Sequence, residues 1–283
     1  MADIIITRTV ADLRQTVQAF RTAGHTIGLV PTLGALHDGH TALVREAKKR
    51  VDRVITTIFV NPTQFAPNED LTKYPRTEES DLAKLRAVKA DVLFAPSVEV
   101  IYPEGFATTV SLAGPAVAGL EDRFRPTHFA GVATIVAKLF TQSGADIAMF
   151  GEKDYQQLMV VTRMARDLDL PIRVIGIETV REEDGLAMSS RNRFLSPADR
   201  AAAPVLYQTL RRTADGMIAG DAFEALLAAG RQAIIAAGFK LDYLEARHAE
   251  SLAPITTLAA GPVRLLVAAR IGQTRLIDNM AVN

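Results

Sequence analysis

A chain of 283 residues, 48% of them hydrophobic, can bury the core of one large domain or of one domain with a smaller companion. Lysine and arginine together number 32, as do aspartate and glutamate, so the chain lacks the basic surplus typical of nucleic-acid-binding proteins. The absence of cysteine excludes disulfides, thiolate zinc sites and thiol nucleophiles, and it fits a cytoplasmic protein.

The N-terminal sequence MADIIITRTVADLRQ lacks the pattern of a signal or transit peptide. Nor does any segment approach the roughly 20 consecutive apolar residues that a membrane-spanning helix needs. We therefore expect a soluble, cytoplasmic protein that binds neither nucleic acid nor membrane.

Short runs rich in β-branched residues predict strands in the first two thirds of the chain, at residues 4–6, 27–30, 54–60, 91–95, 146–150 and 172–177. Apolar stripes at helical spacing predict helices between several of them, near residues 10–20, 82–88 and 132–140. Strands that alternate with helices indicate an α/β fold with a mostly parallel sheet covered on both faces. Ligands of such sheets bind at the carboxyl ends of the strands, so we expect the chemistry in the loops that follow them.

After residue 180 the pattern changes. Ser196 and Pro197 are typical of an N-cap and a first helical position, and they predict a helix that runs to about residue 214. A second, alanine-rich helix is expected after Asp221, followed by strands at residues 240–247, 263–271 and 274–281. We therefore predict a larger domain of residues 1–179 and a smaller α+β domain of residues 180–283.

The segment VPTLGALHDGH, from Val30 to His40, joins a predicted strand to a predicted helix. Its two histidines fit a metal site, a phosphate site or an ordinary surface turn. A metal site would need a third ligand, and the other histidines are scattered without ligand spacing. A helix N-terminus, by contrast, presents free backbone N–H groups to an anion, and imidazoles can donate a hydrogen bond or a proton to it.

Three further motifs carry polar side chains. In FVNPTQF, the carboxamides of Asn61 and Gln64 suit a small hydroxylated substrate, although Asn-Pro is also common in turns. In MFGEKDYQQL, Lys153 follows a strand-ending glycine and can reach a phosphate, or it can belong to a charged surface turn. In GLAMSSRNRFLSP, two serines precede Arg191, a pattern that suits phosphate oxygens on a mobile flap but is also ordinary loop composition.

Taken together, the motifs indicate more than each does alone. Three of them follow strands at what should be one edge of the sheet, and the fourth lies in the adjoining domain. Histidine, lysine, serine and arginine without an acidic metal cage suit ATP that is split at its α-phosphate, where pyrophosphate leaves with a large charge.

The segments PTLGALHDGH, FVNPTQF, HFAGVATIVAKLF, FGEKDYQQL and AMSSRNRFLS resemble the signature blocks of the pantothenate synthetase (pantoate:beta-alanine ligase) family, in the family's order and spacing. The resemblance covers essentially residues 1–283. It implies a Rossmann-like, doubly wound nucleotide-binding domain of the HIGH-motif nucleotidyltransferases, with the smaller domain as a lid. It also implies that ATP activates (R)-pantoate as an adenylate, which beta-alanine then attacks.

From the resemblance we further expect ATP as a substrate accompanied by Mg²⁺, no tightly bound cofactor, no protein metal site, and a homodimer. It implies His40, His37 and Lys153 as catalytic groups, with His40 as proton donor. Pantoate and beta-alanine would meet Gln64, Gln157 and Asn61. The implied ATP-binding residues are Leu33, Gly34, Ala35, Leu36, His37, Asp38, Gly39, His40, Gly151, Glu152, Lys153, Asp154, Val180, Met188, Ser189, Ser190 and Arg191.

Two positions depart from the family pattern. Leu33 stands where the family has methionine, a change that conserves volume. Thr127 stands where it has glycine, although Arg125, His128 and Phe129 are retained. Two alternative functions stay open: a nucleotidyltransferase that makes a dinucleotide, and a nucleotide-binding regulator without catalysis. Pantoate dependence of pyrophosphate exchange separates the first alternative, and retention of His40, Lys153 and Arg191 argues against the second.

Overall fold

The computed structural model describes residues 3–66, 71–72 and 74–283. The chain forms two compact units. The first comprises Met1–Gly151 and Gln156–Ile177, and the second comprises Glu152–Tyr155 and Glu178–Asn283. The short segment Glu152–Tyr155 thus belongs with the C-terminal unit, although it directly follows a strand of the first.

The first unit contains a parallel sheet, which has six strands in the described part of the chain, in the order β1-β4-β3-β2-β5-β6. All six strands predicted from the sequence are confirmed. The continuous apolar runs of the four inner strands, β2 to β5, are what strands buried on both faces require, whereas the edge strands β1 and β6 are more exposed. The bounds are β1 Ile5–Thr7, β2 Ile27–Thr32, β3 Arg53–Ile58, β4 Val92–Phe94, β5 Ile147–Gly151 and β6 Arg173–Ile177.

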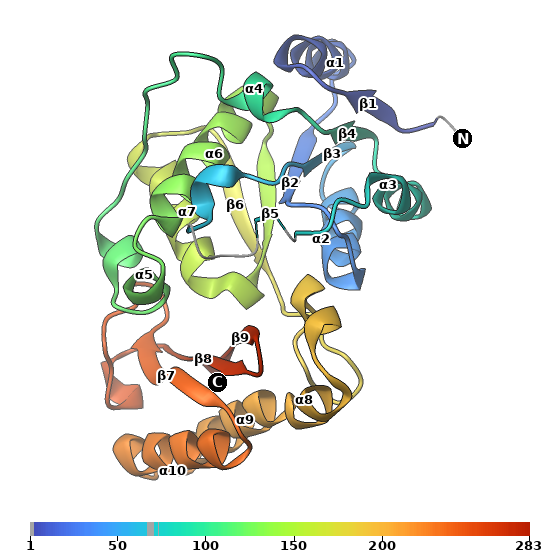
Figure 1. Ribbon diagram of the computed structural model, residues 1–283. Coiled ribbons are helices and arrows are strands. Elements are labelled where there is room, and N and C mark those ends of the chain that lie inside the picture. Colours follow the sequence, from blue (N-terminus) through green and yellow to red (C-terminus); the bar gives the residue numbers. More distant parts are fainter. Residues whose placement is uncertain (1–2, 67–70, 73) are drawn as a thin grey trace. The chain divides into compact units, whose positions relative to one another are not determined.

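Helices cover both faces of this sheet, as predicted. Figure 1 shows α2 and α3 on one side and α6 and α7 on the other. The side chains of α2 and α3 share a core with β2, β4 and β5, and α6 is buried along most of its length. The helices are α1 Val10–Thr22, α2 Asp38–Lys48, α3 Glu78–Ala87, α4 Val98–Ile101, α5 Glu121–Phe124, α6 His128–Ser143 and α7 Tyr155–Asp167.

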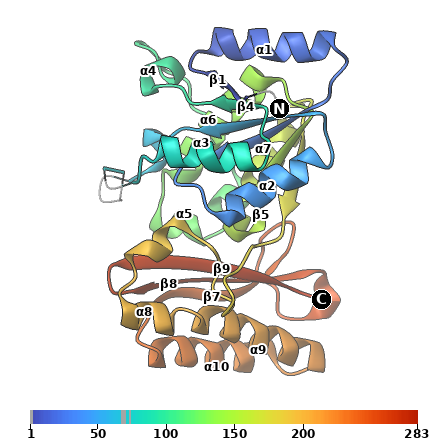
Figure 2. The same ribbon diagram turned by 90° about the vertical axis from the view of Figure 1, so that its right-hand side faces the viewer.

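The second unit contains an antiparallel sheet in the order β7-β8-β9. Figure 2 shows α9 and α10 together against one face of this sheet. Their apolar side chains form one core with alternate residues of the strands. The elements are α8 Pro197–Ala202, α9 Val205–Ala219, α10 Phe223–Ala236, β7 Lys240–His248, β8 Val263–Ile271 and β9 Thr274–Val282.

The predicted helix from Ser196 to about residue 214 is wrong in its continuity. Ser196 does cap a helix, since its hydroxyl accepts the Asp199 N–H at 3.1 Å. That helix ends at Ala202, and α9 begins after Pro204. Proline lacks the N–H that continues a helix and clashes with the preceding turn, so it separates the two segments.

Candidate active site

The carboxyl ends of β2, β3 and β5 lie side by side in the first unit. Strand β2 pairs with β3 on one side and with β5 on the other, and all three are parallel. The prediction that these three strands end at one edge of the sheet is therefore confirmed. From β2 the chain runs outward to β3 and β4, and it returns to β5 on the opposite side of β2. The strand order thus reverses between β2 and β5, which is where open parallel sheets bind ligands.

Both histidines of the HDGH motif lie at the start of α2 and complete its N-terminus. His37 is the N-cap, and its Nδ1 accepts the Gly39 N–H at 3.1 Å. His40 Nδ1 accepts the backbone N–H of His37 at 3.3 Å, so the two rings cap the helix reciprocally. The rings lie 4.0 Å apart between centroids. A nitrogen that accepts an N–H carries no proton, so we infer that each neutral ring has its proton on Nε2.

The loop that leads from β2 into α2 is held by a carboxylate that the sequence motifs do not include. Asp81, on α3, is fully buried and accepts the backbone N–H groups of Ala35 and Leu36, each at 2.8 Å. Ala35 has a φ of +51°, a conformation that non-glycine residues rarely adopt. Lys84, one helical turn after Asp81, donates to the Leu36 carbonyl at 2.6 Å. Helix α3 therefore fixes the path of this loop at its strained position.

The carboxamides of Asn61 and Gln64 meet after β3. Asn61 is fully buried, and its Nδ2 donates to Gln64 Oε1 at 3.0 Å and to the Gly131 carbonyl at 3.2 Å. Its Oδ1 accepts the Tyr102 hydroxyl at 2.7 Å. Both ends of Asn61 are thus occupied within the protein. Because Gln64 Oε1 already accepts from Asn61, the orientation of Gln64 is set with Nε2 as the group for an acceptor.

Residues at and just before the start of helix α6 support the Pro62–Gln64 turn. His128 Nδ1 lies 2.9 Å from the Gln64 carbonyl, and Arg125 Nη1 lies 3.1 Å from His128 Nε2. A Cβ on Gly131 would lie 2.4 Å from the Thr63 carbonyl oxygen, so only glycine allows the helix to approach this closely. Sequence reasoning missed this role of Gly131, although the residue lies inside the HFAGVATIVAKLF block.

Thr127 precedes α6 with φ −98° and ψ −5°. This is ordinary backbone for a residue with a side chain, so the departure from the family glycine introduces no strain. Leu33, the other departure, packs at the edge of a small apolar cluster with Ala35, Phe65 and Tyr74.

The two glutamines of α7 differ in their use. Gln156 is buried, its Oε1 accepts the Glu121 N–H at 2.8 Å, and its Nε2 donates to the Pro115 carbonyl at 2.8 Å. It therefore fixes the segment before α6. Gln157 is half-buried on the neighbouring helix position. The contacts with Glu121 and Pro115 are made by Gln156 and not by Gln157.

Gly151 ends β5 in the first unit, and the predicted ATP-binding residues that follow it in the chain, Glu152–Asp154, Val180 and Met188–Arg191, lie in the second. The side chain of Lys153 is 19% exposed, and its Nζ lies 3.9 Å from Asp154 Oδ2. Residues 180–188 form a hairpin in which the Met188 N–H donates to the Val180 carbonyl at 2.9 Å. Ser189 then caps the following turn, because its hydroxyl accepts the Arg191 N–H at 3.2 Å. Val180 and Met188–Arg191 are thus parts of one local structure.

Within residues 3–66, 71–72 and 74–283, no group of three or more His, Asp or Glu side chains is arranged to hold a metal ion. Over the same residues, no helix is both long enough and apolar enough to cross a membrane.

The parallel sheet with its switch point and the histidine-capped helix define the class: doubly wound α/β proteins that bind ligands at the carboxyl ends of their strands. Comparison with known proteins defines the family. The model of the Pantoate-beta-alanine ligase family matches residues 5–281. The chain therefore belongs to the pantoate-beta-alanine ligase family, as its signature blocks predict.

Individual members of the family match nearly the whole length of this chain. Pantothenate synthetase from Rhodopseudomonas palustris (strain BisA53) is 59% identical over 278 residues, which are 98% of each chain. The crystal structure of pantothenate synthetase from Thermus thermophilus superposes with a TM-score of 0.93 at 48% identity and 99% coverage of both chains. Pantoate-beta-alanine ligase from Francisella tularensis, complexed with beta-gamma ATP and beta-alanine, gives 0.82 at 34% identity and covers 99% of this chain and 98% of that one.

Proposed function

We propose that this protein condenses (R)-pantoate with beta-alanine at the expense of ATP, giving pantothenate, AMP and pyrophosphate. A pantoate carboxylate oxygen attacks the α-phosphorus of ATP, and the bond to pyrophosphate breaks. The beta-alanine amine then attacks the carbonyl carbon of the pantoyl adenylate, AMP leaves, and the amine loses a proton. The observation that carries this proposal is the family match over residues 5–281, with the histidine-capped helix at the sheet's switch point.

In the first unit, residues Leu33–His40 bind ATP, and His37 and His40 face its phosphates. Each Nε2–H donates to phosphate oxygens, whose charge grows as pyrophosphate departs, and His40 is the proton donor. The relative from Francisella tularensis was crystallised with an ATP compound and beta-alanine, which supports the assignment of these substrates. Mg²⁺ enters with ATP as part of the substrate.

Pantoate binds beside Gln64 and Gln157 in this proposal. Gln64 Nε2 donates to a pantoate oxygen, because Asn61 occupies Gln64 Oε1. Asn61 acts by orienting Gln64, since both ends of its own carboxamide are already bonded. Beta-alanine shares Gln64 as its amine approaches the adenylate.

The second unit contributes Glu152–Asp154, which directly follow Gly151, and the residues Val180 and Met188–Arg191. Lys153 and Arg191 place positive charge on the phosphates, and Ser189 and Ser190 donate hydroxyl hydrogen bonds. This unit acts as the lid that keeps water from the adenylate. We further propose that the protein is cytoplasmic and that it forms a homodimer through its nucleotide-binding domain. Light scattering after size-exclusion chromatography tests the dimer by its molar mass.

The reaction is tested by incubating the protein with MgATP, pantoate and beta-alanine. We expect AMP, pyrophosphate and pantothenate in equal amounts, and formation of ADP would contradict the proposal. A nucleotidyltransferase that makes a dinucleotide would exchange pyrophosphate without pantoate. A regulator would bind ATP and release no pyrophosphate.

Variants of the proposed phosphate ligands sharpen the test. By analogy with removal of one oxyanion donor, His40→Ala and Lys153→Met are expected to lower the rate by about 10² to 10³. His25→Ala serves as a matched control, because His25 precedes β2 at the other end of the sheet and bonds Arg53 at 2.9 Å. Equal losses in all three variants would contradict the assigned roles.

A further inference from the structure

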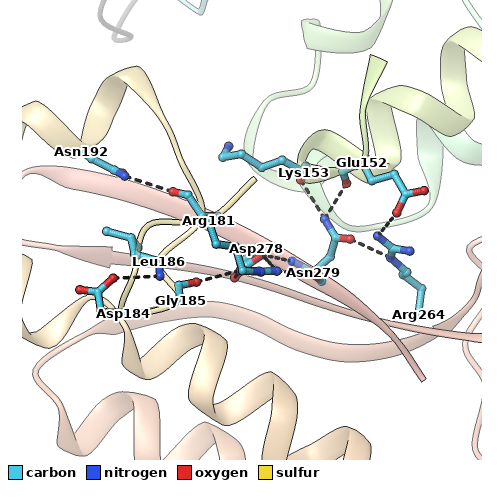
Figure 3. Close-up of polar contacts among 11 residues, drawn as sticks. Glu152, Lys153, Arg181, Asp184, Gly185, Leu186, Asn192, Arg264, Asp278 and Asn279 are labelled. Carbon is cyan, nitrogen blue, oxygen red and sulfur yellow. Dashed lines mark hydrogen bonds and ion pairs between the residues drawn. The ribbon is translucent and has the colours of Figure 1, made fainter. Parts of the chain in front are cut away.

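We propose that two consecutive residues of β9, Asp278 and Asn279, are positioning residues that hold the Lys153 turn and the 180–191 segment in fixed register. The inference rests on the proposed function, because it takes Lys153 and Arg191 as phosphate ligands. All residues concerned belong to the second unit. Figure 3 shows Asn279 between the Glu152–Lys153 backbone and Arg264, with Asp278 beside Arg181.

Asn279 fixes the backbone on both sides of the Lys153 Cα. Its Nδ2 donates to the Glu152 carbonyl at 2.8 Å and to the Lys153 carbonyl at 2.9 Å. These carbonyls belong to the two planar peptide units that flank the Lys153 Cα, so holding both of them sets φ and ψ at that residue. The direction in which the Lys153 side chain leaves the backbone is then set as well. In Figure 3 this side chain extends away from Asn279.

Arg264 fixes Asn279 in turn. Its Nε donates to Asn279 Oδ1 at 2.7 Å, and its Nη2 donates to Glu152 Oε2 at 2.9 Å. The guanidinium carbon also lies 4.1 Å from the centre of the Tyr155 ring. Asn279 is only 3% exposed, so if its amide were removed, water could not reach the Glu152 and Lys153 carbonyls to replace the lost hydrogen bonds. Only a carboxamide both donates twice and accepts at this position.

Asp278 holds the other segment. It is 4% exposed and accepts two hydrogen bonds from Arg181, from Nη1 at 2.6 Å and from Nη2 at 3.0 Å. Arg181 Nη1 also donates to the Gly185 carbonyl at 3.1 Å, and its guanidinium carbon lies 4.1 Å from the centre of the Tyr207 ring. Arg181 bridges to Ala187 across the hairpin that precedes Met188–Arg191.

The two residues act on opposite faces of one strand. Side chains alternate along β9, and Leu276 and Met280 belong to the core beneath α9 and α10. Asp278 therefore points to the helix-covered face and Asn279 to the other face. A single pair of adjacent residues thus links two segments that lie far apart in the sequence. Because β9 is paired along its length with β8, neither segment shifts without disturbing the sheet.

The test is a double-mutant cycle in the full-length protein, with the pantothenate-forming rate as readout. We expect Asn279→Ala to lower kcat by between about 10-fold and 100-fold, as a misplacement of about 1 Å does. In a Lys153→Met background the same change is expected to lower it less than about twofold, since nothing remains to be positioned. An equal factor in both backgrounds would overturn the inference.

A second cycle addresses the hairpin. Asp278→Asn is expected to lower kcat in the wild type and to lose this effect in an Arg191→Ala background, and equal factors would refute the role of Asp278. Asp242→Asn is the control, because it breaks a comparable ion pair with Arg275 of β9, at 2.7 Å, away from both segments. If Asp242→Asn lowers the melting temperature as much as Asn279→Ala and lowers kcat equally, the effect is loss of stability and not positioning.

Two further measurements keep the outcomes distinct. Asn279→Ser, which keeps one donor, is used if Asn279→Ala does not fold, and the same non-additivity with Lys153→Met is expected. If the wild type makes no pantothenate, the proposed function fails, and ATP affinity becomes the readout. Positioning then requires that the β9 variant weaken ATP binding only when Lys153 is present.

Discussion

Replacing Asp81 with asparagine tests how the loop before α2 is held. The carboxylate accepts two backbone N–H groups at 2.8 Å each, and the asparagine carbonyl oxygen can accept only one of them. The second N–H would face an NH₂ group in a site without solvent. A buried donor without an acceptor costs about 1–3 kcal/mol, so Asp81→Asn should lower the free energy of unfolding by that amount. Asp81→Ala removes both acceptors and should cost about twice as much.

The loss should also reach the ATP site, because Ala35 and Leu36 lead directly into the His37 cap. We expect urea unfolding to give the reduced stability and steady-state kinetics to give a raised KM for ATP. Asp215→Asn is the control: Asp215 lies exposed on α9, and its replacement should stay within about 0.5 kcal/mol. An Asp81→Asn variant with the stability and the KM of the wild type would refute the reasoning.

Three other variants address separate parts of the first unit. Gly131→Ala places a Cβ 2.4 Å from the Thr63 carbonyl oxygen, so it should destabilise the protein by about 1–3 kcal/mol and raise the KM for pantoate; unchanged thermal melting would contradict this. His37→Ala removes the N-cap and should lower the free energy of unfolding by about 1 kcal/mol, whereas His37→Asn keeps a capping side chain and should be as stable as the wild type. Both variants should lose activity, and an active His37→Asn would show that the histidine serves only as a cap. Asp146 is partly desolvated, which raises its pKa, but hydrogen bonds from Arg21 and the Ile27 N–H outweigh this and hold the pKa below its ordinary value. Its contribution to stability is therefore present above about pH 4 and lost as the pH falls through the lowered pKa, and Asp146→Asn should flatten the acid side of a melting-temperature profile.

The predicted strands illustrate what a local pattern can determine. Apolar runs such as residues 27–30 and 146–150 form buried strands whichever strands they pair with, so their place in the chain can be predicted from local composition alone. Alternation with helices was enough to predict the parallel sheet and the shared edge at the ends of β2, β3 and β5. The signature blocks then predicted the family, which the match over residues 5–281 confirms. The prediction of one continuous helix through Pro204 was wrong. It gave more weight to the alanine-rich sequence on either side than to a proline, whose missing N–H ends the helix.

The supporting residues could not be read from the sequence in the same way. Asp81 and Asn279 look like ordinary polar residues of a helix and a strand, and each bonds backbone groups that lie 45 or more positions away. Gly131 lies inside a recognised block, but the reason that only glycine fits there is the close approach of α6 to Thr63, which the sequence does not reveal.

The sequence by itself determined which reactive groups the chain offers, because chemistry depends on residue type: imidazoles, carboxamides, an ammonium and a guanidinium. The tertiary structure alone decided how those groups are aimed. The Nδ1 atoms of His37 and His40 cap α2, from which we infer that each neutral ring carries its proton on Nε2, and the orientation of the Gln64 amide is set because Asn61 donates to its oxygen. Orientation of this kind depends on hydrogen bonds to distant backbone, and pairings across such sequence distances exist only once the chain has folded.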